Sequence, residues 1–246
     1  DVCSSDLTLL HITVSQMLLM NGITFVFVVI AIALVDIPVA RATMDQGWRQ
    51  LTQGIRIARS HITLWRLLMS MVVFSLLSLP FVGLFPTIAA TAFGMKPRSA
   101  AYSWLYAVFG FGALLGGLSV GSVFARVDKR KILPPAFVGF AVSLFLFGQL
   151  RSAHLAYPVG FALGTFYFML ATAMNTEFQQ NIEPGERVLV MALWFMAFGG
   201  MVPIGNIAFG PVMDHIGPRW VLAMGALAAL FLAWWCDLLR LEKRSA

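Results

Sequence analysis

Polar side chains recur along one side of the otherwise apolar stretch from residue 156 to residue 176. Thr165, Phe168, Thr172 and Asn175 follow one another at three- and four-residue steps, so a helix places them on one face. Hydroxyl and amide groups are costly against hydrocarbon, so this stripe should face protein or a wet cavity. Hydrogen bonding between helices is the other interpretation, and in membranes it contributes only ~0.6 kcal/mol per contact. We expect the stripe to line a concavity that binds a small molecule.

The opposite face of this stretch is wholly apolar and suited to lipid. Its members recur at the same spacing: Val159, Leu163, Phe166, Leu170 and Ala173. We therefore expect Leu163, Phe166 and Leu170 to point outward. Two further stretches, 67–93 and 188–212, should border the concavity. From these stretches, the residues expected to point into it are Ser75, Ser78, Met196, Gly199 and Asn206.

Catalytic patterns are weak in this chain. Gly117, Ser119 and Gly121 match the G-x-S-x-G pattern of serine nucleophiles. That chemistry needs a strained strand-to-helix turn and a histidine base, whereas this serine lies inside an apolar stretch. The sequence holds no H-E-x-x-H, C-x-x-C or Walker pattern, and Cys3 and Cys236 are far apart. We expect no catalytic residue, no metal and no cofactor; an intramembrane enzyme is the alternative from another functional class.

Composition indicates that lipid is the main solvent of this chain. The hydrophobic fraction is 59% and the charged fraction 11%, whereas a soluble domain has about 25% charged residues. A globule in water could not be covered by so few charges, so the bilayer should be a partner of most of the surface. The net charge is +6, but the basic residues lie between apolar runs rather than on one folded face. This distribution argues against nucleic-acid binding.

The chain is predicted to be an all-α membrane protein with seven transmembrane helices. A bilayer core of ~30 Å needs about 20 apolar residues as helix. The seven stretches are 17–40, 67–93, 102–124, 132–150, 156–176, 188–212 and 220–239. Between the first two, Trp48, Leu51, Ile55, Ala58 and Ile62 recur at helical spacing. This pattern predicts an amphipathic helix on the membrane surface over 41–66, with a soluble linker as the alternative.

Basic residues set the expected orientation. One alternating set of connections holds 13 Lys and Arg and the other holds four, so the richer set, with the C-terminus, should be cytoplasmic. The richer set consists of 41–66, 126–131, 177–187 and the tail from residue 240. No ionisable side chain falls in the middle of a predicted span, and Asp36 and Asp237 lie near the predicted cytoplasmic interface.

Glycines in the third stretch predict close helix packing. Gly112, Gly116, Gly117 and Gly121 form overlapping small-xxx-small spacings. Such spacing lets two helix backbones approach closely, which drives association where lipid removes the hydrophobic effect.

Two glycine-acid turns carry a resemblance to a known family. The segments 121–131 and 210–219 are similar to the G-x3-D-x-x-G-x-R turns of the major facilitator superfamily. Other stretches resemble, in order, its sixth helix, linker helix, eighth, tenth and eleventh helices: Asn21–Phe25, Gly47–Gly54, Phe109–Gly116, Asn175–Pro184 and Phe198–Gly205. The nearest branch resembles the drug and siderophore exporters that include the enterobactin exporter.

The resemblance implies alternating access between two six-helix halves, with ion-driven efflux of a small amphipathic molecule from a bacterial inner membrane. It also implies gating roles for residues in the two turns: Gly121, Arg126, Asp128, Arg130, Asp214, Gly217 and Arg219. The chain departs from the pattern at Ala125, where the motif has an acid. A second departure follows Arg187, where Val-Leu-Val replaces the usual arginines.

The resemblance divides the chain into parts. By this resemblance, residues 8–40 look like the last helix of an N-terminal half, 41–66 like the cytoplasmic linker and 67–246 like the C-terminal six-helix half. Independently of the family, residues 1–7 look like a translated sequencing adapter, with a natural polar loop as the alternative. The seven spans would then be helices six to twelve. We expect the N-terminal half of the same transporter as a missing partner. An inactive truncated fragment is the alternative.

Overall fold

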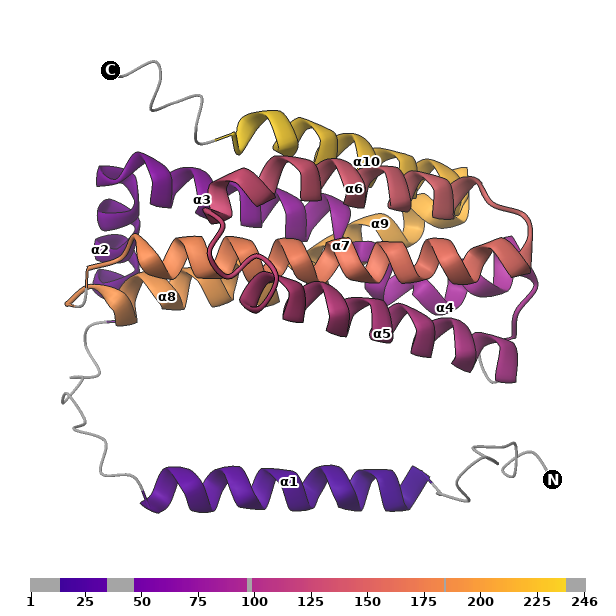
Figure 1. Cartoon of the computed structure of the whole chain (residues 1–246), viewed down its shortest axis with the longest axis horizontal. Helices are drawn as coiled ribbons and strands as arrows, with labels where there is room; N and C mark the ends of the chain where they lie inside the picture. The colour runs from indigo at the N-terminus through magenta and orange to yellow at the C-terminus, as the bar shows by residue number, and fades with distance from the viewer. Residues whose placement is uncertain (1–13, 35–46, 97–98, 184, 238–246) are drawn as a thin grey trace. The chain divides into compact units, whose positions relative to one another are not determined.

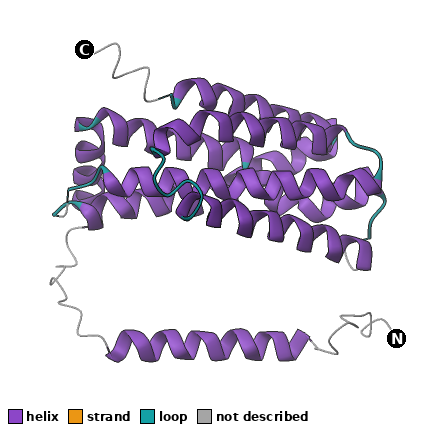
Figure 2. Ribbon diagram, in the orientation of Figure 1, coloured by secondary structure: helices purple, strands orange, loops and turns teal. Residues whose placement is uncertain are grey.

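The computed structural model describes residues 14–34, 47–96, 99–183 and 185–237, and its regular structure there is entirely helical (Figures 1 and 2). The predicted leader at 1–7, the first part of the predicted linker and the basic tail from residue 240 lie outside the described residues. The chain divides into two units, residues 1–47 and residues 48–246.

The first unit contains one helix, α1 (Val14–Leu34). It has no charged residue, and its side chains are mostly apolar. The sequence predicted seven spans, but six helices in the described residues are long and apolar enough to cross a membrane. Helix α1 itself has 21 residues and no charge, and an apolar run over Leu18–Ala31 lies within it. The described structure therefore confirms the six spans of the second unit, and α1 as a seventh span stays a prediction.

The second unit carries the six spans. They are α3 (Ile62–Val73) continuing through η2 (Phe74–Ser78) and α4 (Pro80–Phe93), α5 (Ala100–Gly121), α6 (Lys129–Gln149), α7 (Ala153–Gln180), α8 (Arg187–Phe195) continuing through η3 (Met196–Gly200) and α9 (Met201–Ile216), and α10 (Pro218–Trp235). Helix α7 packs between α5 and α6, and α6 packs in turn against α10 (Figure 1). Aromatic rings fill the centre, where Phe85 stacks on Phe147 with ring centroids 5.4 Å apart.

A short amphipathic helix, α2 (Gly47–Ser60), precedes the first of these spans. Gly54 and Ala58 are buried, and a Cβ at Gly54 would lie 3.2 Å from the Leu189 carbonyl oxygen. The apolar side of α2 therefore packs on α8, beginning at its first turn. The predicted amphipathic segment was too long at its C-terminal end, because the chain becomes extended at His61 and Ile62 starts α3.

Two spans change from α-helical to π-helical winding near their middle. In the first, η2 ends just before Pro80, and the Leu79 amide donates to the Phe74 carbonyl five residues earlier at 3.0 Å. Proline cannot donate to the ladder of the preceding turn, which favours such a local adjustment. The second segment, η3, ends in Gly199-Gly200. The two π-helical segments contact each other across the bundle.

Candidate functional site

Four of the predicted cavity residues lie in the π-helical segments. Ser75 and Ser78 are in η2 and are buried, and the Ser78 hydroxyl donates to the Gly225 carbonyl of α10 at 2.8 Å. Met196 and Gly199 are in η3 and are exposed. The serines therefore face the packed interior, whereas Met196 and Gly199 are exposed on a segment whose Ala197 is buried. The two pairs thus differ in exposure, although the two segments that carry them contact each other.

Asn206 lies on α9 against α4. Its side chain fills the space beside Gly83, where a Cβ would come within 2.8 Å of the amide carbon. The amide oxygen is buried and has no hydrogen-bond partner among the described residues. A buried acceptor without a protein partner costs about 1–3 kcal/mol.

The predicted stripe on α7 borders a hollow shared with α5. Phe168 is 43% exposed and lines a space of about 520 Å³. The other lining residues all come from α5: Tyr106, Phe109, Gly110, Ala113, Leu114, Gly117 and Leu118. Thr165 and Thr172 are half-buried, and the Thr165 hydroxyl donates to the Phe161 carbonyl at 2.9 Å. The concavity beside Phe168 is therefore walled by α5 and not by the two spans predicted to border it.

The predicted outward face of α7 is wrong. Leu163 and Leu170 are fully buried, and Phe166 is half-buried against Gly139 of α6. The physical reason is that α7 lies between α5 and α6, so its wholly apolar side packs into the helix bundle. Lipid and a protein core both select apolar residues, so the pattern alone does not separate them.

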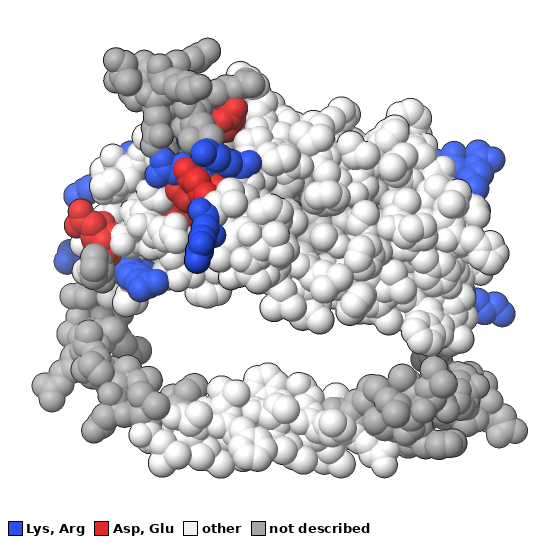
Figure 3. Space-filling view, in the orientation of Figure 1, with Lys and Arg blue, Asp and Glu red and all other residues white. Residues whose placement is uncertain are grey.

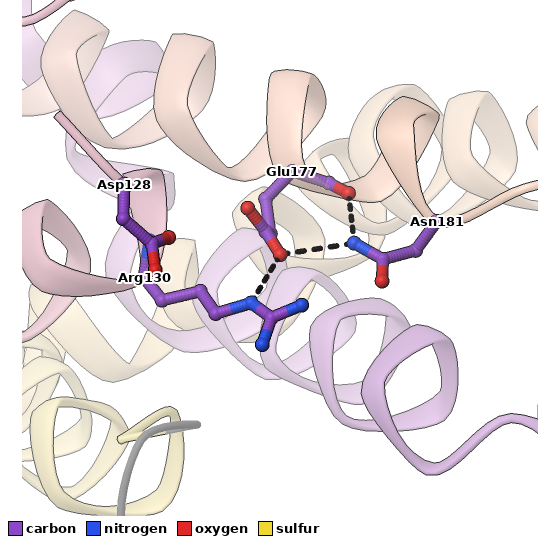
Figure 4. A network of polar contacts seen from close by, with 4 residues as sticks. All are labelled: Asp128, Arg130, Glu177 and Asn181. Atoms are coloured by element: carbon purple, nitrogen blue, oxygen red, sulfur yellow. Dashed lines mark hydrogen bonds and ion pairs between the residues drawn. The ribbon is translucent and has the colours of Figure 1, made fainter. Parts of the chain in front are cut away.

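A buried carboxylate ties the start of α6 to the end of α7 (Figure 4). Glu177 Oε1 accepts from Arg130 Nε at 2.7 Å and from Asn181 Nδ2 at 2.9 Å. The side chain of Glu177 is 4% exposed and that of Arg130 is 23% exposed. We name Arg130, Glu177 and Asn181 the α6–α7 clamp. The sequence interpretation missed Glu177, because it ended the fifth span at Thr176, whereas α7 continues to Gln180.

The other gating candidates of the first turn have local roles. Asp128 caps α6 by accepting from the Arg130 amide at 3.0 Å, a role that acids commonly take at helix starts. Lys129 is buried and its ammonium group donates to the carbonyls of Ala125 and Val127 at 3.1 and 3.0 Å. Gly121 and Arg126 are exposed. This turn is therefore held by Lys129, which the sequence interpretation did not single out.

A polar chain continues from α7 to α8 at the same end of the bundle. Arg187 donates to the Gln179 side-chain oxygen at 2.9 Å, and the Gln179 amide donates to Asn175 Oδ1 at 3.2 Å. The side chain of Asn175, predicted to line the cavity, is thus hydrogen-bonded to Gln179 near the C-terminal end of α7. Together with the α6–α7 clamp, these contacts link both α6 and α8 to α7.

The second glycine-acid turn lies at the opposite end of the bundle. Gly148, at the end of α6, packs against Leu222 near the start of α10. Gly217 has φ of 85°, a conformation that favours glycine, so it allows the sharp change from α9 to α10. Asp214 is exposed and Arg219 is half-buried. On the face shown in Figure 3 the charged side chains of the six-helix unit gather toward its two ends, and the surface between them on that face is uncharged.

The comparisons with known proteins agree with this geometry. The profile of a family described as transmembrane secretion effector, a branch of the major facilitator superfamily, matches residues 9–246. The chain belongs to this family. Members of the superfamily are membrane transporters, and six apolar spans make this one an integral membrane protein. The family therefore points to a transporter rather than an enzyme. Ser119, the serine of the G-x-S-x-G pattern, donates its hydroxyl hydrogen bond within its own helix, to the Gly116 carbonyl at 2.7 Å.

One relative of this transporter-family chain is named for the resistance that it confers. The puromycin resistance protein pur8 of Streptomyces alboniger is 28% identical to it over 156 residues. The match covers 62% of this chain and 30% of that protein. The chain therefore spans less than a third of the length of the curated relative that it matches.

Proposed function

We propose that this chain is part of a secondary transporter that exports small amphipathic molecules by alternating access. The observation that carries the proposal is the pair of facing π-helical segments in the middle of two spans. Such segments occur frequently at functional sites because they interrupt the regular backbone ladder. Met196 and Gly199 in η3 are exposed, and the buried side-chain oxygen of Asn206 lies further along the same span, in α9.

The chemistry of the open surfaces favours an amphipathic substrate. Aromatic and small apolar residues line the hollow beside Phe168, and no charged side chain takes part in it. Thr165, Thr172 and Asn206 add hydroxyl and amide groups near these surfaces. The name of the relative, a puromycin resistance protein, is consistent with export of a molecule of this kind. We extend the proposal to the drug and siderophore exporter branch.

The α6–α7 clamp is proposed to belong to the cytoplasmic gate of this transporter. It lies at the end of the bundle that carries most of the basic residues, and basic loops favour the cytoplasmic side of an inner membrane. By the same assignment Gly217 and Arg219 face outward. Helix α1 is proposed as a seventh span, and a second six-helix half as the partner that completes the pathway.

Transport should require that second half. In an efflux-deficient bacterium, the chain expressed alone should leave puromycin accumulation unchanged, because one wall of the pathway is missing. The same chain joined to the N-terminal half of another family member should lower accumulation until a protonophore is added. Energy-dependent efflux by the chain alone as a monomer, or none by a well-expressed joined protein, would contradict the proposal.

A further inference from the structure

A second hollow lies on the side of the bundle formed by α6 and α10. It has a volume of about 450 Å³, and its lining is apolar. Ala141 and Ala226 form a buried floor, 2% and 3% exposed. Larger exposed side chains form the walls: Val142, Phe145 and Leu146 from α6, and Trp220, Leu227 and Leu230 from α10. We call this hollow the α6–α10 groove; the transport proposal makes no use of it.

The length of the groove matches one leaflet of a bilayer. From Trp220 to Leu230, α10 advances ten residues, which is about 15 Å at 1.5 Å per residue. The hydrocarbon core of a bilayer is ~30 Å thick, so one leaflet contributes about half of that. On α6 the lining residues fall in the second half of the helix, toward its end at Gln149. The groove therefore runs from the middle of the bundle to one membrane surface.

Two basic residues stand where the groove reaches that surface. Arg219 directly precedes Trp220, and Arg151 follows the end of α6 by two residues. The two helix ends are adjacent, because Gly148 packs against Leu222. No acidic residue occurs in 141–152 or 218–230; the nearest along the chain is Asp214, on the other side of Gly217. An apolar slot ending in two cations is complementary to a lipid tail ending in a phosphate.

We propose that the α6–α10 groove binds one acyl chain of an anionic phospholipid, with the lipid phosphate held near Arg219 and Arg151. The inference rests on the membrane-spanning fold and is independent of the transport activity. Alanines at the floor leave room for the tail, while the flanking aromatic and aliphatic walls hold it along the helices. Lipid in this position would bridge α6 and α10 within one leaflet.

Photolabelling in vesicles tests the proposal. The purified full chain is reconstituted in phosphatidylcholine with a small fraction of phosphatidylglycerol that carries a diazirine on its acyl chain. Label should concentrate on residues 141–146 and 223–230. Arg219→Gln and Arg151→Gln should each lower this labelling by about five-fold, the affinity factor for one basic residue at an anionic membrane surface. The variant with both changes should combine the two losses. Inorganic phosphate should not compete.

Filling the groove provides the matched control. Ala223→Trp and, from the other wall, Val142→Trp should remove most of the label from the groove. Met224→Trp should not, because Met224 is exposed on the neighbouring position of α10 but does not line the groove. The elution volume in size-exclusion chromatography and the helical content by circular dichroism identify any variant that is misfolded. Label spread evenly over exposed apolar residues, equal labelling of Ala223→Trp and Met224→Trp, or cross-links between two copies at the groove would overturn the proposal.

Discussion

Replacing Gly116 with leucine will separate α5 from α7 and destabilise the whole helix bundle. A Cβ at Gly116 would collide with the Thr165 carbonyl, and Gly112 and Gly164 meet the opposite backbone in the same way. Backbone atoms cannot rotate aside as a flexible side chain can, so the helices must move apart along their most extensive contact. We expect a loss of about 3 kcal/mol or more in the free energy of unfolding, measured by denaturation in mixed micelles.

Gly110→Leu is the control for this prediction. Gly110 lies on the same helix, and nothing lies within 4 Å of a Cβ placed there. Leucine at this position also has a better helix propensity than glycine. The unfolding free energy of Gly110→Leu should therefore stay within about 1 kcal/mol of the parent. Equal stability of the Gly116→Leu and Gly110→Leu proteins would refute the close packing of α5 on α7.

The α6–α7 clamp should respond unequally to removal of its two charges. Arg130→Ala leaves the Glu177 carboxylate buried with Asn181 as its remaining side-chain partner, and an uncompensated buried charge costs about 3–5 kcal/mol. Glu177→Ala leaves Arg130, which is more exposed and can turn toward water, so its cost should be about 1–2 kcal/mol. Denaturation in mixed micelles measures both losses.

The double variant provides the decisive comparison. Arg130→Ala with Glu177→Ala removes both charges, so it should be more stable than Arg130→Ala alone. Asp128→Ala serves as a control, because Asp128 is exposed and only caps α6; its loss should cost about 1 kcal/mol. If Arg130→Ala proved no more harmful than Asp128→Ala, the buried ion pair would not stabilise this end of the bundle.

Much of the architecture could be predicted from hydropathy and small-residue spacing. The six spans of the second unit follow from apolar length. Gly112 and Gly116 pack closely as predicted, whereas a Cβ at Gly121 would meet nothing within 4 Å. Gly164, on the partner helix, completes the contact. The spacing pattern identified one helix of the pair but carried no information on its partner.

The candidate site was harder to predict for physical reasons. An apolar face such as that of Leu163 and Leu170 satisfies lipid and protein equally, so the outward assignment could not be made from spacing. The π-helical segments depend on tertiary packing, and their only local signals are Pro80 and the pair Gly199-Gly200. Glu177 was assigned to a loop because its charge ended the apolar run, although its ion pair with Arg130 allows it to be buried in α7.

Water access to η3 in the joined transporter tests the proposed pathway most directly. Cys3 and Cys236 are replaced with alanine, and single cysteines are placed at Met196, Gly199 or Met224. We predict that Met196→Cys and Gly199→Cys react with a water-soluble maleimide and that puromycin slows the reaction. Met224→Cys, which is exposed on α10, should face lipid and stay unlabelled. Equal labelling at all three positions, or reaction rates that puromycin leaves unchanged, would contradict a substrate pathway along η3.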